Sequence, residues 1–372
     1  MTDRARPMER FLLAHSGKRN WLAAADDCLG QLPEFPPEAS LGFVYATDAL
    51  ASDLGHLLRY LQAGTPVRDW VGTVGYGICA TGTEYYDAPA LVLLVTDLPR
   101  DHFRVFEDAA AAEAMAFSAA GIQFAVVHGD PRNPQVPRLV RELPGRLGNG
   151  YLCGGLSSSR GYHFQLANAL CEGSLSGVLL DDGIPVFTGL TQGCTPIGPV
   201  RTITRCEGNL LLQLDGRPAL DVLREDVGEL LAHNLHRLGG YIFVGFPVHG
   251  TDTGDYLVRN LISLDVEQGI VGVGEHLEEG RTLMFCRRDA ESAAADLRRM
   301  VRRLHERLPA PARGGLYFSC VGRGQHMFGE AGRELRYLGE ELGDVPVAGF
   351  YANGEIAGDR LYGYTGVLAL FT

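Results

Sequence analysis

The chain has 372 residues, more than one ordinary hydrophobic core uses, so we expect two domains or one large duplicated domain. With 46% hydrophobic and 21% charged residues, its composition is that of a globular protein. The formal net charge of −12 argues against a nucleic-acid partner and against an anionic membrane surface, because both need clustered Lys and Arg.

The sequence lacks the signals of a secreted or membrane protein. Its first 20 residues are polar and contain no apolar segment of signal-peptide length, and no run approaches the about 20 apolar residues of a membrane span. The eight cysteines are scattered and form no C-x-x-C pair, which is typical of reduced thiols rather than of a disulfide framework or a zinc ribbon. We therefore expect a cytoplasmic protein with no membrane contact.

The first structured unit follows a tail over residues 1–36, in which we expect residues 1–20 to be loose and residues 21–29 to form an Ala-rich helix. An apolar strand is predicted over 41–47, then a helix ended by Gly64 and Pro66, then strands over 70–77 and 90–96. The helix carries leucines at spacings of three and four, namely Leu50, Leu54, Leu57, Leu58 and Leu61.

Two later stretches resemble this unit. The second predicts strands over 122–128, 151–156 and 177–180 with a helix over 134–147, and the third a strand over 316–321, a helix and the glycine-bearing strands over 347–358 and 361–371. In each unit about 30 residues separate the first strand from the glycine-bearing one, and the pair Gly72/Gly77 recurs as Gly349/Gly354. We predict a mixed α/β fold of repeated βαββ units that form two mixed sheets flanked by helices, in a pseudo-symmetric arrangement of two halves. Chance similarity of such patterns is the alternative.

A different region separates the second and third units. It predicts a strand over 186–189, a proline-stiffened loop over 191–200, and a hairpin over 201–214 with a Gly208-Asn209 turn. A long helix is expected over 217–238. Strands follow over 241–247, 256–264, 270–273 and 282–286, and an Arg-rich helix over 291–308.

Six motifs in this order resemble the FIST family, the paired N- and C-terminal sensory domains of bacterial signalling proteins and of a eukaryotic F-box protein. They are WVGTVGYG at 70–77, TQGCTPIGP at 191–199, LDGRPAL at 214–220, YLVRNLISLD at 256–265, YFSCVGR at 317–323 and GFYANGEIAG at 349–358. The resemblance covers residues 37–372 and implies a FIST N-terminal domain over 37–238 and a FIST C-terminal domain over 239–372.

The resemblance also implies a function. It indicates a stand-alone sensory protein in signal transduction that binds an amino acid or a similar small polar metabolite and passes the signal to a separate, unidentified partner protein. It implies no catalytic activity, no cofactor and no metal. Two alternatives stay open: a cysteine-dependent enzyme acting on a small metabolite, and a ligand-free protein-interaction scaffold.

Cys320 and Arg323 lie where a predicted strand runs into a helix. Ligands collect at that end of an α/β sheet, and a helix N-terminus favours anions and lowers the pKa of a thiol. Arg323 could bind a carboxylate with two parallel hydrogen bonds. The alternative is a buried, inert thiol beside a structural arginine.

The glycine turn Asn353-Gly354-Glu355 is either a tight turn or the floor of a site, because glycine permits both a positive φ and a close approach to a ligand. The turn after Gly77 lacks a carboxylate at once after its glycine, so a ligand-contacting acid is expected only in the last copy. Arg259, inside an apolar strand pattern, is either a pocket arginine or a structural ion pair, with Glu355 as candidate partner.

Gly193 and Cys194 lie in the loop stiffened by Pro196 and Pro199. Both are candidate ligand-binding residues. In the enzyme alternative the nucleophile is Cys194 or Cys320, and it needs a nearby histidine. The local sequence supplies none beside Cys194, although His163 or His128 could come near in space, so the loop is either a rigid turn or the site of a nucleophile. His233 and His236 have metal-compatible spacing, but no third ligand accompanies them, so we expect no metal there. The arginines of the 291–308 helix form a solvated basic face or a partner-docking surface.

Overall fold

The computed structural model describes residues 10–32, 35, 38–115, 122–148, 150–228, 240–248 and 255–372. The chain divides into two compact units. Unit 1 comprises residues 1–191, 297–361 and 365–372, and unit 2 comprises residues 192–296 and 362–364. Unit 2 is therefore inserted, in sequence, between segments of unit 1.

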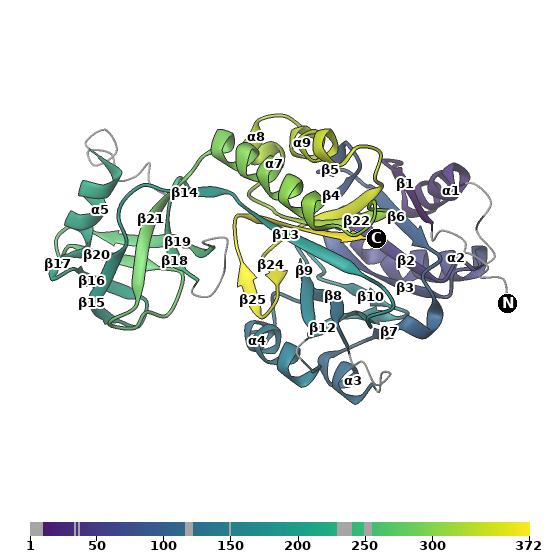
Figure 1. The fold of residues 1–372 in the computed structure, drawn as a ribbon, viewed down its shortest axis with the longest axis horizontal. Coiled ribbons are helices and arrows are strands. Elements are labelled where there is room, and N and C mark those ends of the chain that lie inside the picture. Colours follow the sequence, from purple (N-terminus) through teal and green to yellow (C-terminus); the bar gives the residue numbers. More distant parts are fainter. Residues whose placement is uncertain are drawn as a thin grey trace. The chain divides into compact units, whose positions relative to one another are not determined.

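Unit 1 contains one motif three times: an edge strand, a helix, two parallel strands joined by a helical segment, a short hairpin and a closing strand (Figure 1). Copy 1 consists of β1 (Phe11–Ser16), α1 (Trp21–Gln31), β2 (Leu41–Thr47), η1 (Asp48–Asp53), α2 (Leu54–Gly64), β3 (Asp69–Gly75), β4 (Gly77–Ala80), β5 (Thr83–Tyr86) and β6 (Leu91–Thr96). Copy 2 consists of η2 (Arg100–His102), β7 (Phe103–Phe106), α3 (Ala109–Ala114), β8 (Phe124–Gly129), α4 (Val136–Arg146), β9 (Tyr151–Leu156), β10 (Gln165–Ala167), β11 (Leu170–Cys171) and β12 (Leu175–Leu180). Copy 3 consists of β13 (Val186–Gln192), α7 (Ala290–Arg307), β22 (Gly314–Cys320), α8 (Gln325–Phe328), α9 (Arg333–Leu342), β23 (Val347–Ala352), β24 (Glu355–Ala357), β25 (Arg360–Tyr362) and β26 (Thr365–Phe371).

The three copies exchange their hairpins in a cycle. The sheets have the orders β1-β6-β2-β3-β10-β11, β7-β12-β8-β9-β24-β25 and β13-β26-β22-β23-β4-β5. In each sheet the two central strands are parallel, and the strand that adds to the second of them is antiparallel and comes from another copy. Each sheet is thus completed by a neighbour, so the copies fold as one unit.

The repeat is visible in the register of the parallel pairs. Gly72, Gly154 and Gly349 lie opposite Val44, Val127 and Tyr317, respectively. A Cβ added at these glycines would approach the carbonyl oxygens of those partners to 1.8, 1.8 and 1.7 Å, so no side chain fits there. The predicted correspondence of Gly72 with Gly349 is confirmed, and Gly154 is the third member.

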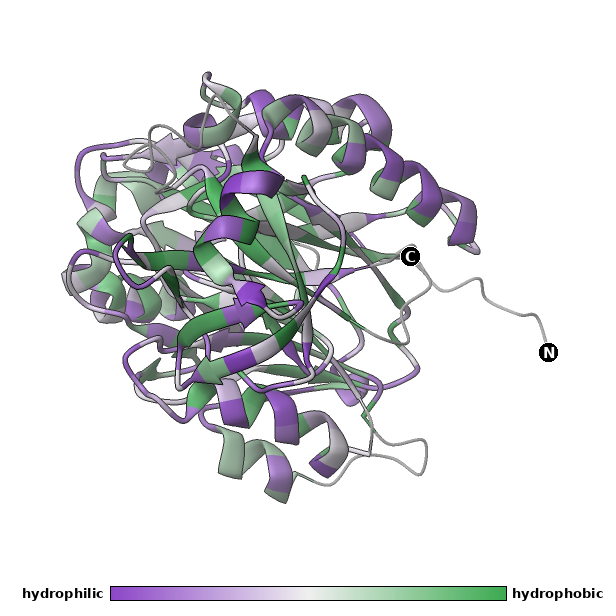
Figure 2. Cartoon of the chain, turned by 90° about the vertical axis from the view of Figure 1, so that its left-hand side faces the viewer, coloured by the Kyte–Doolittle hydropathy of each residue, from purple (hydrophilic) through white to green (hydrophobic). Residues whose placement is uncertain are grey.

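Each sheet packs two helices on its outer face. Residues of α1 and α2 bury apolar side chains against β2 and β3, those of α3 and α4 against β8 and β9, and those of α7 and α9 against β22 and β23. The predicted leucine stripe of the first unit lies on α2 and faces this core. Figure 2 shows the resulting pattern, in which hydrophobic colour follows the strands and the helices alternate between hydrophobic and hydrophilic residues.

The inner faces of the three sheets meet around equivalent residues. Tyr45, His128 and Phe318 are equivalent in the three copies, because each directly follows the residue that faces Gly72, Gly154 or Gly349. Their ring centroids lie 5.6–6.3 Å apart. Tyr45 also stacks on Phe350, with 5.4 Å between ring centroids. All four side chains are buried, so the centre of unit 1 is a packed aromatic core rather than a channel.

Unit 2 is antiparallel. It consists of β14 (Cys194–Pro196), β15 (Arg201–Glu207), β16 (Leu210–Leu214), β17 (Arg217–Pro218), α5 (Ala219–Val227), β18 (Ile242–Pro247), β19 (Tyr256–Asp265), β20 (Ile270–Val273) and β21 (Thr282–Arg288). Because β21 pairs with both β15 and β18, the strands β21-β15-β16-β20-β19-β18 form a closed ring. Its interior is filled by apolar side chains of the strands and of α5. None of the helices in the described ranges has the length and apolar character needed to cross a membrane.

The structure confirms the mixed α/β class and the repeated βαββ units, and it corrects several details. Residues 11–16, expected to be loose, form β1. The strand predicted over 70–77 breaks at Tyr76 into β3 and β4, which belong to different sheets. The described residues form four sheets rather than two.

Two further expectations concern helices. The long helix predicted over 217–238 is in part β17 and the short helix α5, which ends at Val227 before Gly228. The pair His233 and His236 lies outside the described residues. On α7, Arg298 and Arg302 donate to Glu340 and Glu341 of α9, so part of the predicted basic face is neutralised within the fold.

Candidate functional site

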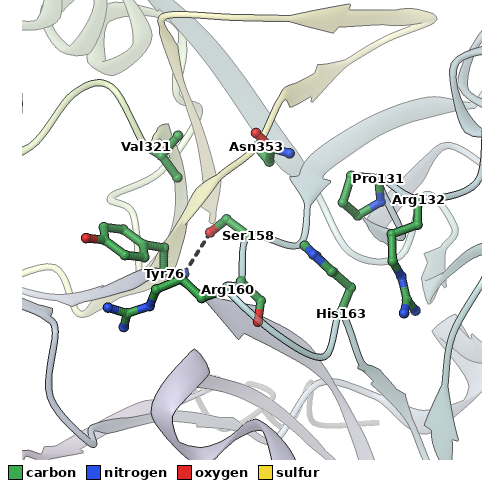
Figure 3. Close-up of a pocket in the computed structure, with 9 residues that line it drawn as sticks. Tyr76, Pro131, Arg132, Ser158, Arg160, His163, Val321 and Asn353 are labelled. Carbon is green, nitrogen blue, oxygen red and sulfur yellow. Dashed lines mark hydrogen bonds between the residues drawn. The ribbon is translucent and has the colours of Figure 1, made fainter.

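A cavity of about 540 Å³ opens in unit 1 (Figure 3). Its volume falls in the range typical of small-molecule sites. All three copies contribute to its lining, which consists of Tyr76, Pro131, Arg132, Ser158, Ser159, Arg160, His163, Val321 and Asn353.

The position of the cavity follows from the repeat. Tyr76, Ser158 and Asn353 each follow by four positions the glycine of their copy that faces the parallel partner strand. Pro131 and Val321 are likewise equivalent, each lying just beyond the first parallel strand of its copy. The cavity therefore lies at the carboxyl ends of the parallel strands, the edge where α/β sheets bind ligands.

Ser158 joins the three copies at this edge. The backbone N–H of Tyr76, from copy 1, donates to its Oγ over 2.7 Å, and its hydroxyl donates to the carbonyl oxygen of Tyr351, from copy 3. The Ser158 side chain is buried, so these bonds are shielded from competing water. A short polar residue is required because only a hydroxyl can accept one bond and donate the other in this space.

Arg160 forms one wall of the cavity and is held by two carboxylates of copy 1. Its Nε and Nη2 donate to Asp48 over 2.8 Å each, its backbone N–H donates to Asp48 over 2.9 Å, and its Nη1 donates to Asp87 over 2.8 Å. The guanidinium lies 4.7 Å from the centroid of the Tyr76 ring, whose hydroxyl also donates to Asp87. Burial opposes ionisation of Asp48, but the hydrogen bonds and charge of Arg160 outweigh it and hold the pKa of Asp48 below its ordinary value.

Arg132 is held differently, by residues of its own copy. Its Nε and Nη2 donate to Asp130 over 3.0 and 2.6 Å, and Nη2 also donates to Glu172 over 3.2 Å. Burial raises the pKa of Asp130, but the hydrogen bonds from Arg132 outweigh that effect and leave this pKa lowered. The Nη1 group of Arg132 has no hydrogen bond within the described part of the chain.

His163 and Asn353 add polar groups to the lining. The Nδ1 of His163 lies 3.3 Å from the carbonyl oxygen of Ser157 and 3.2 Å from its Oγ. In the tautomer with the proton on Nδ1, this nitrogen donates to the carbonyl oxygen and Nε2 is an acceptor. Neither Nε2 nor the Asn353 amide has a side-chain hydrogen bond to the residues that the structure describes.

The lining can therefore both donate and accept hydrogen bonds without a net positive charge. Among the residues that the structure describes, no carboxylate lines the cavity, but four carboxylates form ion pairs with its two arginines. Across the described residues, no group of three or more His, Cys, Asp or Glu side chains could hold a metal ion. The arrangement suits a small polar molecule recognised by directional hydrogen bonds.

Of the residues singled out in the sequence, Asn353 lines the cavity. Arg323, Cys320 and Glu355 lie together but are buried, and none of them is in the lining. Arg323 donates through Nε to Glu334 over 2.7 Å, with both side chains fully inaccessible to solvent. It serves as an interior ion pair in this structure.

Glu355 lies beside Arg323 and Cys320. Burial raises the pKa of Glu355 to about 8, although hydrogen bonds from Thr365, the charge of Arg323 and a hydrogen bond from Cys320 all act to lower it. The backbone N–H and hydroxyl of Thr365 donate to its Oε2 over 3.1 and 2.8 Å. Gly354 faces apolar side chains, since a Cβ there would lie 3.0 Å from Leu361.

The remaining sequence candidates lie in unit 2. Arg259 forms an ion pair with Glu275 over 2.6 Å, in place of the expected partner Glu355. Cys194 is buried on β14, and its carbonyl oxygen accepts a hydrogen bond from the Tyr256 hydroxyl. Gly193 precedes it and is also buried. None of the three contributes to the cavity.

Most of the lining carries no local sequence signal, above all the segment 157–164 with Ser158, Arg160 and His163. The signal that could have revealed it was positional. Extending the glycine correspondence to Gly154 places Ser158 in register with Tyr76 and Asn353, at the same strand end of the second copy.

Comparison with known proteins agrees with this architecture. The model of the FIST N domain matches residues 40–217 and that of the FIST C domain matches residues 219–358, so the boundary between them lies within unit 2. An uncharacterized protein of Mycobacterium tuberculosis (strain ATCC 25618 / H37Rv) is 34% identical over 336 residues, which are 85% of this chain and 86% of that protein. An uncharacterized protein of Mycobacterium bovis is 32% identical over 371 residues, 94% of this chain and 93% of that protein. The chain thus belongs to the FIST family, whose domains are sensory domains in signal transduction.

Proposed function

We propose that this protein is a cytoplasmic sensor that binds a small polar metabolite in the cavity of unit 1 and signals through a separate partner protein. The observation that carries the proposal is the cavity itself, which all three copies line at the carboxyl ends of their parallel strands. Because the three copies are tied together around it, a ligand that fits there would stabilise the whole unit.

The ligand is an amino acid or a molecule of similar size and polarity. The lining offers a donor at Arg132, an acceptor at His163 and both at Asn353, which suits a molecule that carries donors and acceptors side by side. The compensated charge of the arginines argues against a strongly anionic ligand, since no net positive field would attract one.

The test is a thermal-shift screen with the twenty amino acids and a set of small organic acids, sugars and amides. A ligand present at about 100 times its Kd adds roughly 2.7 kcal/mol to the free energy of unfolding, a readily measured rise in Tm. Tight hits should then be confirmed by calorimetry. A flat response across the whole library would count against the proposal.

Two variants locate the site. Asn353→Tyr fills the cavity from its rim and should abolish the shift with little change in the Tm of the ligand-free protein, because the exposed Asn353 side chain makes no hydrogen bond within the described residues. Glu355→Gln, at a buried residue outside the lining, is the control and should retain binding. The reverse result would move the site from the cavity to the buried glutamate.

A further inference from the structure

We propose that Arg160 is a positioning residue, which holds the cavity wall in place from copy 1, and that its charge is not the group that meets the ligand. The inference rests on the proposed function in that the cavity is taken as the ligand site. It assigns a role to Arg160. It also predicts that replacing Arg132, the other arginine of the cavity, has a different effect, for a structural reason.

The segment that Arg160 holds is the largest single contributor to the cavity. Residues 157–164 supply four of the nine lining residues, namely Ser158, Ser159, Arg160 and His163. The segment runs between β9 and β10, which belong to different sheets, so neither strand ladder fixes its middle. Its conformation there depends on side-chain bonds.

Beside the two bonds that Ser158 makes, Arg160 supplies four, and all four go to copy 1. Three of its guanidinium nitrogens and its backbone N–H donate to Asp48 and Asp87, at 2.8–2.9 Å. Its face lies over the Tyr76 ring, and the Tyr76 hydroxyl closes the network by donating to Asp87 over 3.1 Å. In Figure 3 the Arg160 side chain lies beside Tyr76, across the cavity from Arg132 and Pro131.

The acceptors are themselves held in place. Asp48 has a nearly inaccessible side chain, 4% exposed, at the start of η1. Asp87 has a φ of 55°, a left-handed conformation that non-glycine residues seldom adopt and that Asp tolerates better than most. An arginine with a carboxylate on each side has its charge compensated and its nitrogens committed, so it is poorly placed to bind a ligand group.

Arg132 provides the contrast within the same cavity. It is about as exposed as Arg160, at 48% against 55%, and it too contacts two carboxylates. Its partners Asp130 and Glu172, however, belong to its own copy, and the nearer one is two residues away. Among the described residues, no hydrogen bond of Arg132 joins two copies, which makes its replacement a matched control for that of Arg160.

The experiment measures hydrogen exchange of the full-length, ligand-free protein by mass spectrometry. Arg160→Gln should raise the exchange rate of peptides covering 157–164 by at least about tenfold, since it removes several hydrogen bonds between charged groups. Arg132→Gln should leave these peptides within about twofold of wild type. Arg160→Lys keeps the positive charge beside Asp48 but loses the planar guanidinium with its several donors. Its peptides over 157–164 should therefore be protected more than those of Arg160→Gln and less than those of wild type.

A second readout reports on the cavity itself. Acylation of histidines by diethyl pyrocarbonate, followed by peptide mapping, should label His163 several-fold faster in Arg160→Gln, because its ring lines the released wall. His128 is fully buried in the core and should stay unlabelled, which shows that the variant is folded. If His128 were labelled, Asp87→Asn, which removes a single acceptor, would replace Arg160→Gln.

The outcomes separate this inference from the proposed function. Unchanged exchange and acylation in Arg160→Gln, or equal increases in Arg132→Gln, would overturn the positioning role even if a ligand is found. Because both measurements use the ligand-free protein, a failed ligand screen would overturn the proposed function and leave this result standing.

Discussion

Two clusters of charged residues in unit 1 have similar composition and opposite surroundings. The cavity cluster joins Arg160 to Asp48 and Asp87, with an arginine that is 55% exposed. The buried cluster joins Arg323 to Glu334, with both side chains at 0% exposure, and places Glu355 close by. When the exposed cluster is broken, water can hydrate the remaining charged group. In the buried cluster no water is available to replace a lost partner. The contrast separates residues that shape a site from residues that hold the fold.

Both clusters depend on the repeated frame, and breaking it should have the largest effect. Gly349→Ala places a Cβ 1.7 Å from the carbonyl oxygen of Tyr317, so we expect a loss of more than about 4 kcal/mol or failure to fold. Gly339→Ala is the same chemical change within α9, where nothing lies within 4 Å, and should be neutral or stabilise by about 0.5–1 kcal/mol. Urea denaturation of both variants makes the comparison. Similar stabilities would refute the close parallel pairing.

The next largest effect comes from breaking the buried cluster. Glu334→Gln removes the carboxylate that pairs with the buried Arg323 and should cost about 3–5 kcal/mol, because it breaks a buried ion pair by removing one partner's charge. In the cavity cluster, Asp87→Asn removes one exposed acceptor of Arg160 and should cost no more than about 1 kcal/mol. Equal losses in chemical denaturation would erase the distinction between the two clusters.

The buried cluster should also make the stability of the protein depend on pH, through Glu355. The pKa of its carboxyl is about 8 in the folded protein, above its ordinary value of 4.5, so the folded state binds a proton that the unfolded state releases between these values. Stability from this group is present below pH 4.5 and falls by about 3 kcal/mol as the pH rises to 7. Glu355→Gln should lack this fall. Parallel stability curves for wild type and variant, measured from pH 4.5 to 8, would contradict the burial argument.

Asp48 should show the opposite and smallest dependence. Its pKa lies below the ordinary value, so its stabilising bond with Arg160 is present above the pKa of the unfolded chain and is lost as the pH falls through the lowered folded pKa. The wild type should therefore lose a fraction of a kcal/mol on the acid side that Asp48→Asn does not lose, the partner being half exposed. Thermal unfolding from pH 2 to 5 tests this. An advantage of wild type over Asp48→Asn that grows as the pH falls would have the opposite sign and would refute the pairing.

Some features of the fold can be predicted because the spacing of neighbouring residues in the sequence indicates them. The leucines of α2 recur at helical intervals, and the apolar runs of β2 and β6 are long enough for central strands. The structure has these three elements where the sequence predicts them. Gly72 and Gly349 share a position relative to their strands, which exposed the repeat. The candidate site was less accessible: of the predicted residues only Asn353 lines the cavity.

The rest depended on contacts between distant residues. Arg323 and Glu355 are site candidates in the sequence because charged residues beside glycines in apolar strands often mark a site. The sequence does not distinguish a charge that meets a ligand from one that meets a partner such as Glu334. Likewise the role of Arg160 follows only from the fold, which brings Asp48, 112 residues earlier in the chain, to 2.8 Å from its Nε. No local pattern carries that information.

The sequence by itself determined the strand–helix alternation, the apolar core and the glycines that let parallel strands pair closely, since each follows from the periodicity and steric size of neighbouring residues. Only the tertiary structure decided which hairpin completes which sheet, and thereby which strand ends meet around a cavity. The cyclic exchange brings Tyr76, Ser158 and Asn353 together from positions up to 277 residues apart. Backbone hydrogen bonds between strands are the same for any sequence, so the choice of partner rests on packing across the whole unit.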